Sequence, residues 1–109
     1  MGESGNRYVW IFVFFDLPVK IKKDRKIATE FRRFLIQDGY IMIQFSVYAR
    51  ICNGNERVEK HLKKLQKSLP TKGSIRVLEI TDNQYQRMKI LVGKSHENEK
   101  KHDKQLLLF

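Results

Sequence analysis

The sequence predicts a single α+β domain in which two helices cover one face of an antiparallel sheet. Three observations lead to this fold class. The chain has 109 residues, a length that suits one domain with one modest core. Its apolar content of 41% is ample for folding. The apolar residues follow strand-like and helix-like spacing in the order strand, helix, strand, strand, helix, strand, with one further short strand at the end.

The first strand is the most informative segment of the chain. Residues 8–15 are eight consecutive apolar residues, rich in aromatic and β-branched types, which is typical of a strand buried on both faces. The run ends at Asp16, and Pro18 then stops the strand because proline has no N–H to donate. Asp16 is therefore expected at the C-terminal end of a central strand, where α/β layers usually place ligands and chemistry. The alternative is an ordinary solvated acid.

A basic loop and an amphipathic helix follow the first strand. Asp24 is the expected N-cap of this helix, and Gly39 provides its C-terminal stop. The apolar positions at helical spacing between them are Ile27, Phe31, Phe34 and Leu35. Arginine and lysine residues occupy the remaining positions, so the outer side of the helix is predicted to be basic.

The segment 40–51 is predicted to be extended, but it is too long for one typical strand. We expect it to break at residues 44–46 and to form two strands. A second helix is expected next, because Asn53 and Glu56 have the spacing of a capping box. Its apolar stripe consists of Val58, Leu62, Leu65 and Leu69.

Two short strands complete the pattern. Residues 74–81 alternate in polarity, which is typical of a strand, and Met88–Val92 are predicted to form one more. The whole order is the ferredoxin-like βαββαβ arrangement with an extra C-terminal strand. Because the second face of the sheet also carries apolar residues, it must be covered, and a second copy of the chain could do so as a homodimer.

The chain divides into a ferredoxin-like domain over residues 1–93 and a tail over residues 94–109. The tail begins as a charged linker that is expected to be solvated. It ends with the four apolar residues Leu106–Phe109. This segment is expected either to fold back onto the chain's own sheet or to add a strand to the sheet of a partner.

The charge balance favours a polyanionic partner. The chain carries 22 Lys and Arg against 12 Asp and Glu, a net charge of +10. Nucleic acid is the simplest such partner, although a merely solubilising surface has the same composition. The candidate phosphate-binding residues are Lys20, Lys22, Lys23, Arg25, Arg50 and Arg76. Most Phe and Tyr side chains are expected in the core rather than as platforms for base stacking.

The cysteine and hydropathy patterns favour a cytoplasmic protein. Cys52 is the only cysteine, so neither an intrachain disulfide nor a thiolate metal cluster can form. Residues 1–6 lack the layout of a signal peptide. The apolar run of residues 8–15 is far too short to span a bilayer, so no association with a membrane is expected.

Several short motifs follow one another along the predicted domain. They are Val13–Pro18, Arg25-Lys26, Phe31–Leu35, Gly39-Tyr40, Ser46–Arg50, Leu69–Gly73, Arg76–Leu78 and Gln84-Tyr85. Taken together, this ordered set resembles the CRISPR-associated protein 2 family, the small partner of the CRISPR spacer integrase. The Phe-Asp-Leu-Pro strand end and the Gln-x-Ser-Val-Tyr segment look most like members from type II CRISPR loci.

The resemblance implies a ferredoxin-like homodimer that acts in CRISPR adaptation, the acquisition of foreign DNA fragments as new spacers. It implies CRISPR-associated protein 1, the integrase, and double-stranded DNA as partners, with single-stranded RNA as another substrate. Some family members are described as magnesium-dependent endonucleases, and Asp16 matches the strand-end aspartate that the family assigns to the metal.

The chemistry of magnesium limits what one chain can do with Asp16. Mg²⁺ takes six oxygen ligands and usually uses one or two carboxylates together with waters and phosphates. Two Asp16 residues facing each other across a dimer axis would provide two carboxylates, so Mg²⁺ is expected at the dimer interface if the protein is catalytic. No residue is an obvious general base, and His61 is expected on the surface of the second helix.

The sequence leads to two hypotheses about function. The favoured one is a dimeric scaffold for the integrase and foreign DNA in spacer acquisition, with Mg²⁺-dependent endonuclease activity at the paired Asp16 residues. The alternative is a toxin-like, metal-dependent endoribonuclease of the VapD type, which shares the fold and acts without an integrase.

Overall fold

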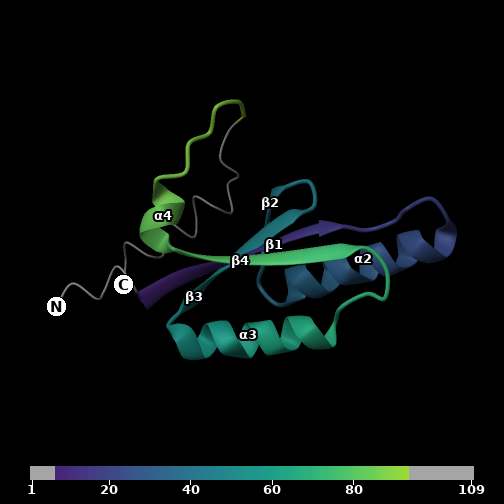
Figure 1. Cartoon of the computed structure of the whole chain (residues 1–109), viewed down its shortest axis with the longest axis horizontal. Coiled ribbons are helices and arrows are strands. Elements are labelled where there is room, and N and C mark those ends of the chain that lie inside the picture. Colours follow the sequence, from purple (N-terminus) through teal and green to yellow (C-terminus); the bar gives the residue numbers. More distant parts are fainter. Residues whose placement is uncertain (1–6, 94–109) are drawn as a thin grey trace.

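A computed structural model describes residues 7–93 of the chain. Its elements are β1 (Tyr8–Asp16), α2 (Lys22–Gln37), β2 (Ile41–Gln44), β3 (Val47–Asn53), α3 (Asn55–Lys67), β4 (Ser74–Thr81) and α4 (Asp82–Gln86). The four strands form one antiparallel sheet in the order β2-β3-β1-β4 (Figure 1). This is the strand order of a βαββαβ fold, so the predicted fold class is confirmed.

The position of β1 explains its sequence. It lies between β3 and β4 and bonds to both, so neither of its edges reaches solvent. Its alternate side chains enter two different clusters, with Ile11 and Val13 on one face and Trp10 and Phe12 on the other. All four are buried, so β1 is a central strand that is covered on both faces over residues 10–13, whereas Phe14 is partly exposed.

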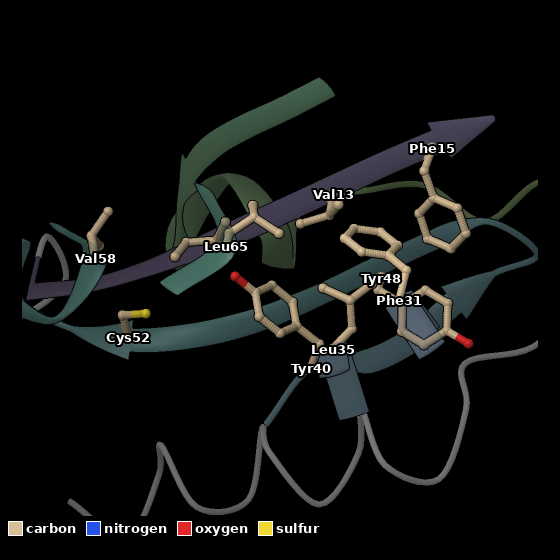
Figure 2. Close-up of a cluster of buried hydrophobic side chains, with 10 residues drawn as sticks. Val13, Phe15, Phe31, Leu35, Tyr40, Tyr48, Cys52, Val58 and Leu65 are labelled. Carbon is tan, nitrogen blue, oxygen red and sulfur yellow. The ribbon is translucent and has the colours of Figure 1, made fainter. Parts of the chain in front are cut away.

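The larger core lies between the sheet and the two long helices (Figure 2). Phe31 and Leu35 of α2 and Val58 and Leu65 of α3 pack in the same cluster, which places both helices on one face of the sheet. The rings of Phe15 of β1 and Phe31 of α2 pack edge to face, with centroids 5.3 Å apart. Edge-to-face contacts of this kind add stability beyond the area that they bury.

The second face of the sheet, which we call the open face, carries a smaller cluster. Tyr85 of α4 stacks on Trp10 with ring centroids 4.0 Å apart, and the Trp10 Nε1 donates a hydrogen bond of 2.9 Å to Asp82. α4 is held at its start by a capping box between Thr81 and Gln84. This five-residue helix covers one part of the open face, while Leu78 on β4 remains 52% exposed.

Both predicted helix starts were wrong. α2 begins before Asp24, which lies in its first turn, is buried and places a carboxylate oxygen 3.6 Å from the Lys72 Nζ. Asn53 is the last residue of β3 rather than a cap, and α3 follows Gly54 without a side-chain cap. The positive φ of Gly54, +94°, shows why glycine is needed at this sharp change of direction.

The predicted break within residues 40–51 is confirmed, because β2 and β3 form a hairpin joined by Phe45 and Ser46. The predicted strand at Met88–Val92 was wrong: these residues are irregular, and the side chain of Val92 is 94% exposed. A strand needs a neighbouring strand to hydrogen-bond with, and residues 88–92 pair with none of the four strands of the sheet.

The tail lies outside the described residues, and so does the Leu106–Phe109 segment, so the boundary expected at residue 93 stays a prediction. Within residues 7–93, no helix has both the length and the apolar character needed to cross a membrane.

Candidate functional site

Asp16 lies where the sequence predicted, at the C-terminal end of the central strand. Its backbone is paired with Ser74 at the start of β4, and its side chain is exposed. Among residues 7–93, no side chain forms an ion pair or hydrogen bond with the carboxylate of Asp16. The carboxylate is therefore available to a ligand.

The backbone at this strand end is held in place by Gly73. A side chain at this position would place its Cβ 2.6 Å from the carbonyl oxygen of Asp16 and 2.7 Å from the Cδ2 of Leu17. Gly73 also has a φ of +93°, which favours glycine. Leu17 in turn packs against the main core. The tight contact between Gly73 and the Asp16–Leu17 backbone fixes the direction of the chain at Asp16.

A hollow of about 310 Å³ lies beside Asp16. It is lined by the ends of β1 and β4 and by the β2–β3 turn, and the lining residues are Phe14, Phe15, Asp16, Phe45, Ser46, Val47, Ser74 and Arg76. The Phe15 N–H donates a hydrogen bond of 3.0 Å to the Ser46 carbonyl oxygen, which ties the turn to β1. In Figure 1 the β2–β3 turn and the arrowhead of β1 point toward the same end of the molecule.

The fit of a metal to this hollow is partial. A carboxylate is a suitable ligand for Mg²⁺, but Mg²⁺ also requires further oxygen ligands in octahedral geometry. The part of the chain between residues 7 and 93 contains no group of three or more acidic, histidine or cysteine side chains that could hold a metal ion. Asp24 is engaged with Lys72. Residues 7–93 of one chain therefore offer a single carboxylate at this hollow, so further ligands would have to come from elsewhere, such as a second copy or the substrate.

Four of the six predicted basic residues cluster after β1. Lys20, Lys22 and Lys23 are exposed in the loop that leaves Asp16 and in the first turn of α2. Arg25 has a second task, because its Nη1 donates hydrogen bonds to the carbonyl oxygens of Val19 and Lys20. Arg25 thereby braces the loop that carries Lys20, and its exposed side chain keeps further N–H groups for solvent or phosphate.

Arg50 and Arg76 have opposite environments. Arg50 is half-buried, and its guanidinium donates to the carbonyl oxygens of Asp38 and Ile51. Arg76 is exposed on β4 opposite Phe14 and lines the hollow with Asp16. The structure thus brings Arg76 to the candidate site and leaves Arg50 in an internal network.

The surface position predicted for His61 was wrong. Its side chain is 7% exposed, and its Nδ1 lies 2.8 Å from the Oδ2 of Asp38. Burial lowers the pKa of His61 below its ordinary value, and the hydrogen bond to Asp38 opposes that shift. Sequence spacing placed His61 beside the apolar stripe of α3 but could not reveal that the end of α2 offers it a carboxylate. His61 does not line the hollow beside Asp16.

Neither Phe45 nor the basic surface of α3 was among the site residues predicted from the sequence. Phe45, at the tip of the hairpin, is 82% exposed, contrary to the general expectation that aromatic side chains belong to the core. The helices also carry nearly all the excess positive charge of the regular elements. α2 has six basic and two acidic residues and α3 has five and two, whereas the four strands together have two of each. The lysine spacing in α3 was the available signal for this second basic surface.

Comparison with known proteins decides the family. Residues 9–88, well over half of the chain, match the model of the family described as CRISPR associated protein Cas2. The chain belongs to the Cas2 family. Of the two families considered from the sequence, the comparisons support this one.

Individual Cas2 relatives resemble the chain over most of their length. A protein of Acidovorax ebreus named CRISPR-associated endoribonuclease Cas2 is 55% identical over 91 residues, which cover 84% of this chain and 89% of the relative. A protein of the same name from Flavobacterium psychrophilum is 48% identical over 103 residues, 94% of this chain and 90% of the relative. A third, from Parvibaculum lavamentivorans, is 42% identical over 93% of this chain and 100% of the relative.

Proposed function

We propose that this Cas2 protein is a dimeric scaffold in CRISPR adaptation, which holds the integrase and foreign DNA, and that two Asp16 residues form a Mg²⁺-dependent nuclease centre in the dimer. The observation that carries the proposal is the exposed carboxylate of Asp16, which has no ion pair within residues 7–93 and lies at the end of a central strand, next to an open apolar sheet face. The endoribonuclease names of the relatives support a nuclease, with RNA among its substrates.

The open face supports a homodimer. Phe14 and Leu78 lie on this face and are 37% and 52% exposed, next to the buried Phe12. Burying a large apolar side chain completely contributes roughly 2 kcal/mol, so pairing two such faces is favourable. Since Phe14 is two residues from Asp16, a dimer that buries Phe14 also brings the two carboxylates toward the interface.

The charge distribution supports nucleic acid as the bound partner. Lys and Arg contacts to phosphates provide binding without regard to sequence, which suits a protein that handles foreign DNA of any sequence. Lys20, Lys22 and Lys23 follow directly after the Asp16 strand end, and Arg76 lines the same hollow. These residues would hold the phosphate backbone close to the two carboxylates.

The catalytic roles follow from the positions of the side chains. Asp16 would hold the metal, which when bound supplies an activated water and neutralises charge on the phosphodiester. Arg76 would bind a phosphate oxygen through its guanidinium and keep the backbone in the hollow. Ser46 and Ser74 also line this hollow and offer hydroxyl groups to the same backbone.

The first experiment measures cleavage of single-stranded RNA and double-stranded DNA in Mg²⁺ and in EDTA. We expect Mg²⁺-dependent cleavage that Asp16→Ala and Asp16→Asn abolish. Glu30→Gln is the matched control, because Glu30 is an exposed acid of α2 outside the hollow, and it should leave cleavage unchanged. Cleavage that survives in both Asp16 variants would contradict the nuclease centre.

The scaffold role needs a separate test. Because scaffolding depends on dimerisation and on basic surfaces, Asp16→Ala should keep the dimer, bind the integrase and support spacer acquisition in cells. Loss of acquisition by Asp16→Ala protein that still dimerises and still binds the integrase would show that the scaffold alone is insufficient.

A further inference from the structure

The β2–β3 turn carries an aromatic side chain that no packing contact explains. Phe45 is 82% exposed, whereas Phe14 is 37% exposed and the other described aromatic residues are buried or half-buried. Leaving a large apolar side chain in water forgoes roughly 2 kcal/mol of burial energy. Within residues 7–93, Phe45 belongs to neither apolar cluster.

The local backbone does not call for phenylalanine either. Gln44 and Val47 pair across the hairpin, so Phe45 and Ser46 form a two-residue turn. Glycine, asparagine and aspartate are the usual residues in such turns. Ser46 nevertheless adopts a φ of +65°, the only positive φ of a residue other than glycine among the described residues. Departures from local rules of this kind concentrate at functional sites.

The turn is held firmly beside the candidate site. The Phe15 N–H donates a 3.0 Å hydrogen bond to the Ser46 carbonyl oxygen, so the turn is anchored to the residue that precedes Asp16. Phe45, Asp16 and Arg76 line one hollow of about 310 Å³. Arg76 forms no ion pair with any residue in the described part of the chain.

These three side chains have complementary uses toward a single nucleic-acid strand. An exposed aromatic ring can stack on the face of any unpaired base, and an arginine can neutralise the adjoining phosphate. Bases within a duplex are already stacked on their neighbours, so they offer no such face unless the strand is opened.

We propose that Phe45 is a stacking platform for an unpaired nucleobase, which it would hold at the hollow that it lines together with Asp16 and Arg76. This inference rests on the proposed nucleic-acid function and names a residue that would position the bound strand. Phe45 is therefore a positioning residue, since it would orient the strand beside Asp16 without touching the reacting atoms.

Phe45→Trp gives a direct optical test. Trp10 is the only native tryptophan and is fully buried, so an added indole at position 45 would report on the turn. We titrate this variant with DNA and RNA oligonucleotides of the same sequence. Each is used as an intact single strand, as a single strand with abasic sites, and as a duplex. The intact single strands of both DNA and RNA should quench the fluorescence of the added indole. The abasic strands and the duplexes should quench it only weakly.

Binding measured on unlabelled variants provides the second readout. Phe45→Leu should weaken single-strand binding by roughly five- to a hundred-fold, the range expected for loss of one base–aromatic stack. Phe45→Tyr should restore it, and duplex binding should not change. Ile36→Ala is the control, because Ile36 is 59% exposed on α2 and does not line the hollow.

Three outcomes would overturn the inference: equal quenching by abasic and intact strands, unchanged single-strand affinity in Phe45→Leu, or a shift of Phe45→Leu from dimer to monomer, which would make Phe45 a subunit contact. These outcomes are separate from failure of the nuclease proposal. If Asp16→Ala still cleaves while Phe45→Trp is quenched by intact strands alone, the nuclease centre is wrong and the stacking platform stands.

Discussion

Two regions of the molecule use the same residue types in opposite ways. The hollow at the end of β1 contains Asp16 and Arg76, and neither forms an ion pair with another residue of the described chain. The cluster between α2, β3 and α3 contains Asp38 and Arg50, and both are engaged: the Asp38 carboxylate accepts from His61 and Lys64, and Arg50 donates to two carbonyl oxygens.

The difference separates residues that stabilise the fold from residues that remain available for a ligand. The cluster of Asp38, Arg50 and His61 joins the end of α2 to β3 and α3, so its charges are compensated inside the protein. In the hollow the charges face solvent on rigid strand ends, the arrangement expected where a phosphate and a metal bind. Four experiments test this division, from the largest expected effect to the smallest.

Gly73→Ala should have the largest effect on stability. The added Cβ would clash with the Asp16 carbonyl oxygen, and the alanine would have to adopt a φ of +93°. Left-handed strain and steric overlap together should lower the free energy of unfolding by roughly 3 kcal/mol, with loss of cleavage as Asp16 moves. Urea denaturation measures the free energy of unfolding. Gly54→Ala, at a φ of +94° with no atom within 4 Å of the added Cβ, isolates the left-handed strain.

Arg50→Met and Arg76→Met form a matched pair. Removing Arg50 leaves the Asp38 and Ile51 carbonyl oxygens without their donor, so stability should fall by roughly 2 kcal/mol. Removing Arg76 should change stability by less than about 0.5 kcal/mol, since exposed charges contribute little. Urea midpoints of the two variants measure both values. Equal destabilisation would abolish the distinction between the two regions.

The pH dependence of stability should depend on His61. Burial lowers its pKa in the folded state below the ordinary value of 6.5, despite the nearby Asp38; Arg50 and Lys64 lower it further. The unfolded chain then binds more protons than the folded one near and below pH 6.5, so stability should fall as the pH drops from 7.5 to 5.5. His61→Gln should reduce this loss, as followed by urea midpoints at both pH values. An unchanged pH profile would show that His61 does not titrate in this window.

Arg76→Gln should have the smallest effect and should appear only in binding. If Arg76 contacts one phosphate, the slope of log K against log salt should become shallower by about 0.7–0.9 for a nucleic-acid ligand. Fluorescence anisotropy over a series of salt concentrations measures the slope. The corresponding Arg50→Gln variant, studied at a temperature where it is folded, should keep the native slope because its guanidinium is engaged internally.

Much of the fold could be predicted from local sequence patterns. The eight-residue apolar run identified β1 as the central strand, and proline fixed its end at Asp16. Helix starts failed because capping preferences are weaker than tertiary demands: Asp24 is buried beside Lys72, and Gly54 makes the turn that precedes α3. Spacing predicts periodic elements well, but it does not specify which charged side chains meet after folding.

The same limit applies to the candidate site. Asp16 was identified because it interrupts an apolar run, a signal that lies within a few residues. Arg50 and Arg76 are indistinguishable by sequence, since each is a lone arginine in a strand. Only the tertiary contacts show that Arg50 is engaged and that Arg76 has no ion pair within residues 7–93. Phe45 was missed because its exposure depends on the turn that it occupies.

The most direct test of the central claim is to mix wild-type and Asp16→Ala protein in equal amounts, allow the subunits to exchange, and measure Mg²⁺-dependent cleavage. If each centre requires two Asp16 carboxylates, only dimers with two wild-type subunits cleave, and activity should fall to about one quarter of that of the same total amount of wild-type dimer. Activity of about one half would show that each subunit works alone, which would contradict a shared nuclease centre.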